Sequence, residues 1–424
     1  MNGVNKYIKL GDLVKEGKGK IHTGPFGSQL HASDYVQSGI PCIMPANMLN
    51  NYLDLSEIAY INEIDASRLS KYLVEEGDIV YSRRGDVTQK ALIRSFESGY
   101  FCGTGCLLIR PGIHIDSNYL LYYLSLKELK TWIKKQAVGA TMPNLNTGIL
   151  SDIPFKFIEL EKQIAVASIL RTLDKKIELN NRINTELEAM AKTLYDYWFV
   201  QFDFPDEHGK PYKSSGGKMV YNETLKRDIP EGWGVKKWGE LITIESGYPF
   251  KSSDYTDNGR YKVITIKNVQ DGELILDKCD TINFIPTNLS EKCYLSLGDI
   301  LISLTGNVGR ICVVHCEELL LNQRVGKISC DNVYKNYVYR YFTMSSTHDW
   351  LKRVSNGSAQ QNLSPNDIIK GNCLIPNLNV IEKFNRLHQP IYIKRHLASL
   401  NNQKLTELRD WLLPMLMNGQ VTVK

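Results

Sequence analysis

Three pairs of short polar segments carry the side chains in this sequence that are best suited to bind a ligand by hydrogen bonds. The richest is SRRGDVTQK at 82–90, and its counterpart at 303–310 reads SLTGNVGR. Arg can bind guanine through two hydrogen bonds, and Asn or Gln can bind adenine in the same way. Gly, Asn and Ser also fill ordinary turns. These segments therefore leave DNA recognition and plain turn structure as open alternatives.

The two other pairs are GPFGSQ at 24–29 with GYPFKS at 247–252, and GAT at 139–141 with GSAQQN at 357–362. Residues that differ between counterparts, such as Arg84 and Thr305, are better candidates for reading a sequence than the shared Gly85 and Gly306. The candidate DNA-binding residues are Ser28, Gln29, Arg83, Arg84, Thr88, Gln89, Lys90, Thr141, Lys251, Ser252, Thr305, Asn307, Arg310, Ser358, Gln360 and Gln361.

Sequence motifs of catalysis are missing. There is no GxxxxGK[ST] loop for a nucleotide, no GxGxxG for a dinucleotide or methyl donor, and no HExxH. Cys102 and Cys106 are four apart, as are Cys312 and Cys316, which is not the CxxC spacing of a zinc site. We therefore expect no catalytic residue, no metal and no cofactor bound by this chain.

Composition narrows the class of protein without naming its function. The 424 residues are 43% hydrophobic and carry a net charge of +5, which is ordinary for a globular protein and too small to establish DNA binding. No apolar run is long enough to span a membrane, and the N-terminus lacks the apolar core of a signal peptide. With nine scattered cysteines and no export signal, we expect reduced thiols and a cytoplasmic protein.

The elements that position the polar segments occur twice, at an offset of 221 residues. GDIVYSRRGDV from Gly77 aligns with GDILISLTGNV from Gly298, and about a hundred residues further on Asn180 aligns with Asn401. A single offset at well-separated places predicts a tandem duplication, with a period too long for a solenoid.

Each copy ends in a long run whose apolar residues recur every three or four positions, which predicts a helix with one apolar face. From Glu161 to Leu194 such a helix would be about 51 Å long. Its apolar face needs a partner, and we expect the helix of the other copy, paired antiparallel. Pro390 should kink the second helix or mark its start.

Asn180 and Asn401 fall in the two apolar stripes. They either fix the register of the helix pair or are simply solvated. The residues predicted to pack or set the register are Leu173, Ile177, Asn180, Leu187, Asn401, Leu405, Leu408 and Leu412.

The predicted fold is α/β, of the mixed α+β type, with a duplicated globular domain and two paired long helices. In each copy, short apolar runs punctuated by Gly, Pro and Asn predict strands. A helix over 117–136, with Ser117 as its N-cap, follows. The predicted boundaries are a globular domain at 1–157, a helix at 158–200, a linker at 201–232, a second globular domain at 233–378 and a final helix at 379–424.

Three segments carry a family resemblance. They are LYDYWFVQFDFPDEHGKPYKSSGGKMV from Leu194, IPEGWGVKKWGEL from Ile229, and LRDWLLPMLMNGQV ending at Val421. Together with the GDI-x-x-S-x-x-G repeats, they make the chain resemble, over nearly its whole length, the specificity (S) subunit of type I restriction-modification systems.

The resemblance implies that each globular domain is a target recognition domain that reads one part of a split, asymmetric DNA sequence. The paired helices would set the gap between the parts and dock two methyltransferase subunits, which use S-adenosylmethionine to methylate adenine at N6. Restriction subunits would add ATP- and Mg²⁺-dependent translocation and cleavage, and the chain itself would catalyse nothing. The alternative is a helical scaffold that organises partner proteins without reading DNA. Base-contacting residues differ among family members, so none is carried over.

Overall fold

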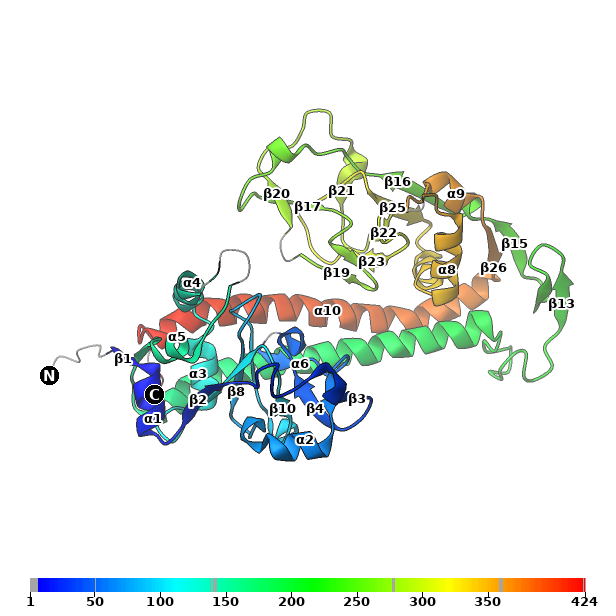
Figure 1. Ribbon diagram of the computed structural model, residues 1–424. Helices are drawn as coiled ribbons and strands as arrows, with labels where there is room; N and C mark the ends of the chain where they lie inside the picture. The colour runs from blue at the N-terminus through cyan, green and yellow to red at the C-terminus, as the bar shows by residue number, and fades with distance from the viewer. Residues whose placement is uncertain are drawn as a thin grey trace. The chain divides into compact units, whose positions relative to one another are not determined.

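The computed structural model describes residues 7–49, 51–137, 139, 143–276, 279–357, 361–421 and 423. The chain divides into two compact units (Figure 1). The first unit comprises Met1–Ile177 with Lys404–Lys424, and the second comprises Glu178–Gln403. Both long helices, α6 and α10, contribute one part to each unit. The boundary between the compact units therefore falls within the helices.

The first unit is built on two four-stranded sheets. One has the order β2-β11-β8-β9 and is antiparallel throughout, and the other has the order β10-β4-β7-β3 with β10 and β4 parallel. The strands of these sheets are β2 (Lys20–Thr23), β3 (Tyr35–Val36), β4 (Ile40–Ile43), β7 (Ala59–Ile61), β8 (Ile79–Ser82), β9 (Lys90–Leu92), β10 (Phe101–Cys102) and β11 (Cys106–Arg110).

Short elements complete the first unit. Two strand pairs, β1 with β12 and β5 with β6, lie outside the main sheets. The remaining elements are β1 (Tyr7–Lys9), α1 (Leu10–Glu16), β5 (Met48–Leu49), β6 (Tyr52–Leu53), α2 (Glu63–Arg68), α3 (Ser117–Tyr123), α4 (Lys127–Gln136), α5 (Thr147–Ser151) and β12 (Pro154–Lys156).

The second unit repeats most of this topology. Its antiparallel sheet has the order β16-β25-β22-β23, and its mixed sheet has the order β20-β17-β24-β21 with β17 and β24 parallel. The strands are β16 (Ile242–Ser246), β17 (Tyr261–Ile264), β20 (Asp280–Ile282), β21 (Tyr294–Leu295), β22 (Ile300–Ser303), β23 (Ile311–Val313), β24 (Leu319–Leu321) and β25 (Val325–Cys330). All four strands of the antiparallel sheet correspond in order to β2-β11-β8-β9, and β24-β17-β20 of the mixed sheet correspond to β10-β4-β7, whereas the edge strands β3 and β21 differ. This correspondence agrees with the duplication predicted from the 221-residue offset.

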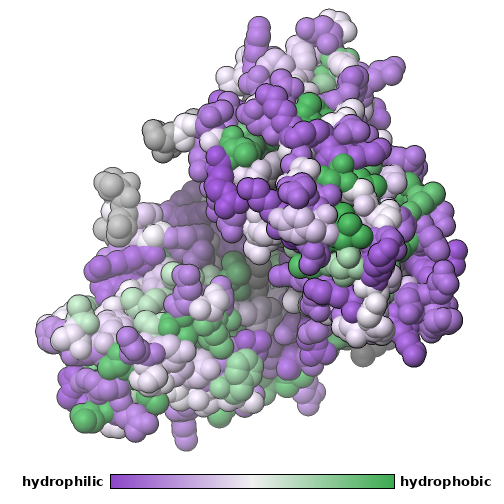
Figure 2. All heavy atoms as spheres, turned by 90° about the vertical axis from the view of Figure 1, so that its right-hand side faces the viewer, coloured by the Kyte–Doolittle hydropathy of each residue, from purple (hydrophilic) through white to green (hydrophobic). Residues whose placement is uncertain are grey.

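Helices and short strand pairs again flank these sheets. They are β13 (Met219–Asn222), β14 (Arg227–Pro230), β15 (Gly234–Lys237), β18 (Val269–Gln270), β19 (Glu273–Leu274), α7 (Lys335–Phe342), α8 (Ser345–Val354), α9 (Pro365–Ile369) and β26 (Asn372–Ile375). The face of this unit seen in Figure 2 is covered mainly by hydrophilic side chains, with apolar ones in small groups. The apolar side chains are instead gathered in its core.

The repeated GDI motif explains why equivalent strands begin alike. Gly77 and Gly298 have φ angles of 86° and 84°, a left-handed conformation that favours glycine. The Asp that follows accepts a hydrogen bond from the backbone N–H three residues before it, Glu75 in one unit and Ser296 in the other. The chain then enters β8 or β22, whose side chains are buried throughout.

The helix expected over 117–136 is two helices. α3 and α4 are separated at residues 124–126, and the N-cap of α3 is Asp116, whose carboxylate accepts the Tyr119 N–H at 2.8 Å. Ser117 is the first helical residue, so the prediction of Ser117 as the cap was wrong by one position.

The two long helices are α6 (Leu160–Tyr195) and α10 (Leu378–Met417). Pro390 does not mark the start of α10, because the helix begins twelve residues earlier and continues past the proline. In the second unit, Asn184 donates to Ser399 at 3.3 Å and Asn180 donates to Asn402 at 2.8 Å. As residue numbers rise along α6 they fall along α10, so the helices are antiparallel, as predicted.

The asparagine that faces Asn180 is Asn402 rather than Asn401. Asn402 accepts from Asn180 and donates to Asn181 at 2.7 Å, whereas Asn401 is exposed. Leu408, which was predicted to pack, is 42% exposed. Asn402 and the partly buried Arg409 face α6 instead. Apolar spacing alone does not identify polar residues in a helix contact, so it selected their neighbours Asn401 and Leu408.

The other residues predicted to pack in the helix pair are buried or partly buried. Asn180 is buried, and the remaining side chains are partly buried, namely Leu173, Ile177, Leu187, Leu405 and Leu412. In the first unit, Leu412 packs against the core together with the buried Leu416 and Met417.

In each unit an ion pair joins α6 to α10. In the first unit, Arg409 donates to Asp174 at 2.9 Å, and the Tyr122 hydroxyl donates to the same carboxylate at 2.6 Å. In the second unit, Glu188 on α6 pairs with Arg395 on α10. Glu188 also accepts from Arg340 on α7 at 3.0 Å, so one carboxylate serves two guanidinium groups.

Burial raises the pKa of Glu188, but the hydrogen bond and charge of Arg340 and the charge of Arg395 outweigh it and lower the net pKa. His388 lies beside this group and accepts from Arg340 Nε at 2.8 Å. Burial and the charge of Arg340 lower the pKa of His388 to about 3, so it is neutral. The group thus contains two buried or partly buried cations that depend on one carboxylate.

Part of the predicted linker belongs to the core, which corrects its description as a connector. Phe202 and Phe204 are buried and pack against Trp233, with ring centroids 5.6 and 5.1 Å away. The hairpin β13–β14 follows, and Ile229 on it is also buried. The Gly, Pro and charged residues of this segment form turns, while its few aromatic residues pack into the core.

We expect Glu188→Gln to lower the free energy of unfolding by about 3 kcal/mol, because it leaves two guanidinium groups without their carboxylate. The measurement is urea unfolding of the whole chain. The control is Glu186→Gln, an exposed residue of the same helix. Equal effects of the two substitutions would contradict a special role of Glu188.

Candidate nucleic-acid interface

In the first unit, two of the predicted segments meet at one edge of the antiparallel sheet. β2 ends at Thr23 and leads into 24–29, and β8 ends at Ser82 and leads into 83–89. Both are joined to the start of β11, since Gly24 N donates to Cys106 O and Arg83 N donates to Gly105 O. The Arg83 guanidinium also lies 5.3 Å from the centroid of the exposed Phe26 ring.

Residues that follow the third segment, Asn144 and Leu145, join the same edge. Arg84 forms a β-bridge with Asn144, and Leu145 N donates to Arg83 O at 2.9 Å. Arg83 Nε and Asn144 Oδ1 are buried without a hydrogen-bond partner among the described residues. Polar atoms of this kind usually have a partner, so this edge offers unused donors and acceptors.

The second unit brings the equivalent segments together in the same way. β16 leads into 247–252 and β22 leads into 304–310. Thr305 forms a β-bridge with Asn362, and Gly306 N donates to Gln361 O at 3.0 Å. Thr305 Oγ1 is buried without a partner among the described residues. In each unit, the loops after β2 and β8, or after β16 and β22, and the residues around Asn144 or Asn362 therefore form one polar edge, which we call the recognition edge.

Most of the predicted DNA-binding residues lie on a recognition edge, but their side chains differ in exposure. The exposed ones are Ser28, Arg84, Gln89, Lys251, Ser252 and Asn307, and the partly buried ones are Gln29, Arg83, Thr88, Thr305, Arg310 and Gln361. Several of the latter have structural bonds. Gln29 accepts from Tyr72 at 2.9 Å, Thr88 donates to Asp86 at 2.7 Å, and Arg310 donates to Gln270. Thr141, Ser358 and Gln360 lie outside the described residues.

Lys90 is a correction. It is the first residue of β9 rather than a loop residue, and it is 3% exposed. A side chain this buried cannot reach a base or a phosphate, so Lys90 leaves the candidate set. Burial lowers the pKa of its ammonium group to about 7, and the charge of Lys130 adds to the shift.

Helix α4 supplies basic residues that the sequence reasoning did not select. Its sequence KELKTWIKKQ places Lys127, Lys130, Lys134 and Lys135 in exposed positions. Two of them act on the loop after β8. Burial raises the pKa of Asp86 in this loop, but hydrogen bonds from Thr88 and the charges of Lys134 and Lys130 outweigh it and lower the net pKa. The four lysines within ten residues of the sequence could have indicated this basic surface.

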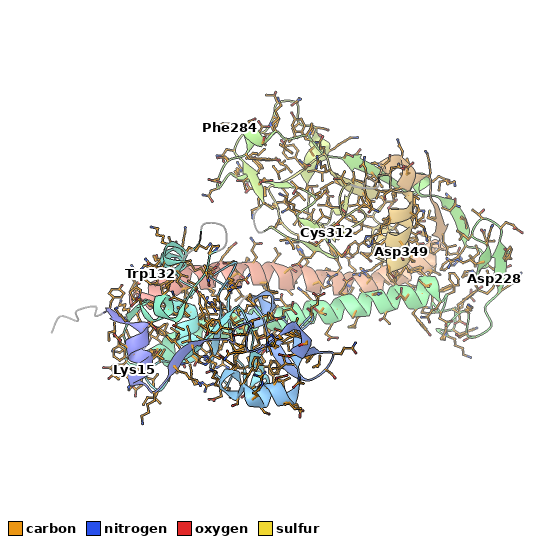
Figure 3. The ribbon with its side chains drawn as sticks, viewed as in Figure 1. Lys15, Trp132, Asp228, Phe284, Cys312 and Asp349 are labelled. Carbon is orange, nitrogen blue, oxygen red and sulfur yellow. The ribbon has the colours of Figure 1, made fainter. Side chains whose placement is uncertain are left out.

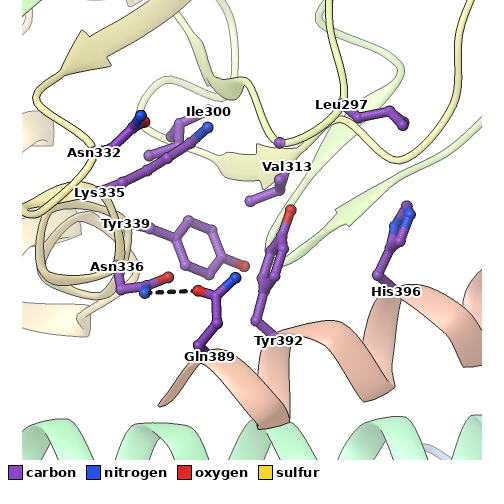
Figure 4. A pocket seen from close by; sticks show the side chains of 11 residues that line it. Leu297, Ile300, Val313, Asn332, Lys335, Asn336, Tyr339, Gln389, Tyr392 and His396 are labelled. Carbon is purple, nitrogen blue, oxygen red and sulfur yellow. Dashed lines mark hydrogen bonds between the residues drawn. The ribbon is translucent and has the colours of Figure 1, made fainter. Parts of the chain in front are cut away.

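A cavity of about 400 Å³ lies in the second unit between α7, the strands β22 and β23, and α10 (Figure 4). Asn336 of α7 donates to Gln389 of α10 at 3.2 Å and to Asn385 at 3.0 Å. The amides, Tyr339 and Tyr392 therefore join the globular part of this unit to its long helix.

The cysteines flagged by their spacing are packing residues. Cys312 lies inside the core on β23 (Figure 3), and burial raises the pKa of its thiol. Cys102 and Cys106 are equally buried. Among the residues that the structure describes, no group of three or more His, Cys, Asp or Glu side chains is arranged to hold a metal. In the same part of the chain, no helix is long and apolar enough to cross a membrane.

Comparison with known proteins places this arrangement in a family. The model of the type I restriction modification DNA specificity domain matches residues 5–189 and 230–391, one match for each copy of the repeat. The chain therefore belongs to the family of type I restriction-modification DNA specificity subunits. It is a specificity subunit rather than a catalytic one.

Individual relatives agree with the family. The chain is 25% identical to the type I restriction enzyme MjaIX specificity subunit of Methanocaldococcus jannaschii, over 92% of this chain and 89% of that protein. It is 24% identical to the HindI specificity subunit of Haemophilus influenzae, over 89% and 94%. The crystal structure of the S subunit from M. genitalium matches with a TM-score of 0.57 and 16% identity, covering 98% of this chain and 97% of the other, and supports the fold.

The buried ammonium of Lys90 makes a pH-dependent prediction. Its pKa is about 7 in the folded chain and 10.5 for an ordinary lysine. Between these values the unfolded chain holds a proton that the folded chain does not, so stability falls as the pH drops from 10.5 to 7. Lys90→Met should therefore raise the free energy of unfolding by about 3 kcal/mol at pH 6, and by much less at pH 10.

The measurement is urea unfolding at both pH values. Lys127→Met, at an exposed position of α4, serves as the control and should change stability little at either pH. A gain for Lys90→Met that is the same at pH 6 and pH 10 would show that the ammonium group is not the cause.

Proposed function

We propose that each unit reads one part of a bipartite, asymmetric DNA target through its recognition edge. The observation that carries this proposal is that loops far apart in sequence form equivalent polar edges in the two units while their exposed residues differ. Arg84 in one edge is replaced by Thr305 in the other. Equivalent loops with different side chains suit two different half-sites. The alternative of a scaffold that does not read DNA has no support from the comparisons.

The lysines of α4 complement this role. Base edges specify a sequence, whereas phosphates position the protein without specifying it. Exposed Arg84 has the geometry to bind guanine through two hydrogen bonds. The lysines beside the loop after β8 are suited to the backbone of the duplex. We assign direct reading to the loops and phosphate contact to α4.

The long helices are proposed to set the gap between the half-sites and to dock two methyltransferase subunits. Support comes from apolar side chains that α6 and α10 expose within the second unit, namely Leu179, Ile183, Met190, Leu387, Ile393 and Leu397. Exposed apolar groups in such numbers are typical of protein interfaces. The complex would methylate adenine at N6 with S-adenosylmethionine bound by those partners.

Restriction subunits that use ATP and Mg²⁺ would complete the endonuclease. We place the complex in the cytoplasm, where its DNA lies. This chain itself would supply neither the methyl donor site nor the nuclease site.

The proposed function is tested by expressing the chain with its methyltransferase partner and sequencing the cellular DNA for N6-methyladenine. We expect one split motif with a methylated adenine in each part and a constant gap. Methylation without a common motif, with an active partner, would contradict the proposal. A single unsplit motif would contradict reading by two units.

The division between base and phosphate contacts makes a separate prediction. In the assembled methyltransferase, Arg84→Ala should weaken binding to the cognate duplex about 10- to 100-fold and binding to random duplex much less. Lys134→Ala should weaken both equally and reduce the salt dependence of binding. Equal losses on both duplexes for Arg84→Ala would make Arg84 a phosphate contact.

A further inference from the structure

The two ion pairs between the long helices have the same polarity. In the first unit the acid is Asp174 on α6 and the base is Arg409 on α10. In the second unit the acid is Glu188, again on α6, and the base is Arg395, again on α10. Thus α6 supplies both carboxylates and α10 supplies both guanidinium groups.

These four residues occupy only two positions of the repeat. Adding the offset of 221 to residue 174 gives 395, and adding it to 188 gives 409. Residues 174 and 395 therefore occupy one position of the repeat, and residues 188 and 409 occupy the other. Each ion pair joins one residue at each of these two positions. Asn181 and Asn402 are also 221 apart and hydrogen-bond each other, so this position meets its own equivalent.

The arrangement has a consequence for pairing between identical helices. The helices come from duplicated segments, so a second copy of α6 could lie against α6 in the same register. Asp174 of each helix would then face Glu188 of the other. For two copies of α10, Arg395 would face Arg409 twice. Only α6 with α10 places opposite charges together at both sites.

The charged side chains of these pairs are partly buried and hydrogen-bonded, so the sign of each charge affects which helix can pair. The Asp174 side chain is 10% exposed and that of Arg395 is 19% exposed. Each pair also has further hydrogen bonds, from Tyr122 to Asp174 and from Arg340 to Glu188. Partly buried charges are screened little by salt, and like charges held together across an interface disfavour the wrong partner.

We propose that these two ion pairs select the partner of each long helix. They favour the pairing of α6 with α10, and they disfavour both the pairing of α6 with a second α6 and the pairing of α10 with a second α10. The contacts among Asn180, Asn181 and Asn402 set the register but would recur with either partner, because positions 180 and 181 of the first copy and 401 and 402 of the second are all Asn. The charges therefore decide which helix is accepted.

Selection of this kind keeps one recognition edge of each type in every assembly. A pair of identical halves would carry two identical edges and read a symmetric target. This consequence rests on the proposed function, whereas the pairing rule does not and is tested without DNA.

The test uses the full chain, cut once after folding at a protease site inserted at Gly209, in an exposed turn with open space around it. The cut chain is unfolded in urea and refolded by dilution, so that the amino-terminal and carboxyl-terminal pieces choose partners again. Native mass spectrometry then counts pairs of unlike and of identical pieces.

The decisive variant is Asp174→Arg with Arg409→Glu. It keeps opposite charges between α6 and α10 at both sites, but it also makes each helix complementary to a copy of itself. We expect wild-type pieces to form unlike pairs, and we expect identical pairs to rise at least about tenfold in this variant.

A neutral variant, Asp174→Asn with Arg409→Gln, is the matched control. It removes repulsion between identical helices without adding attraction, so its proportion of identical pairs should lie between the other two. It also keeps the test valid if the charge-exchanged chain refolds poorly. Identical pairs in the wild type at the proportion expected by chance would overturn the proposal. So would equal proportions in all three proteins.

Discussion

The pairing of α6 with α10 is the interaction on which the rest of this structure depends. Two long helices cannot leave their apolar faces in water, and each unit buries a part of both. The contact also contains polar groups that need partners. Asn402 bonds to Asn180 and Asn181, and Asp174 and Glu188 on α6 each meet an arginine on α10. A shift of the helices by one turn would leave these groups buried and unpaired, which costs more than the loss of an apolar contact. The register is therefore held by polar groups on an apolar background.

The globular part of each unit follows from a different constraint. Equivalent strands in the same order place the loops after β2 and β8, and those after β16 and β22, at one edge of a sheet. The sheet and its buried strands tolerate little change because their packing is close. The loops carry their side chains outward and are free to differ. This separation explains how one duplicated scaffold presents Arg84 in one unit and Thr305 in the other.

Much of the fold could be predicted from the sequence. The offset of 221, the GDI turns and the long apolar periodicity predicted two modules and two antiparallel helices, and these are present. Most errors involve a polar residue that is buried or partly buried, and one involves aromatic residues among turn residues. Lys90 looked like a loop residue because lysine is seldom inside a strand. Phe202 and Phe204 were hidden in a segment rich in turn residues. Asn401 and Leu408 were chosen over Asn402 and Arg409 because only apolar spacing was counted.

The sequence by itself determined the duplication, the family and the kinds of elements, because these depend on periodicity and on motifs that lie within a few residues of each other. The tertiary structure decided which polar residues belong to the helix contact and which loops share an edge. Asp174 and Arg409 are separated by 235 residues, and nothing local distinguishes them from solvated surface charges. A buried charge is favourable only with its partner, and that partner is known only after the chain has folded.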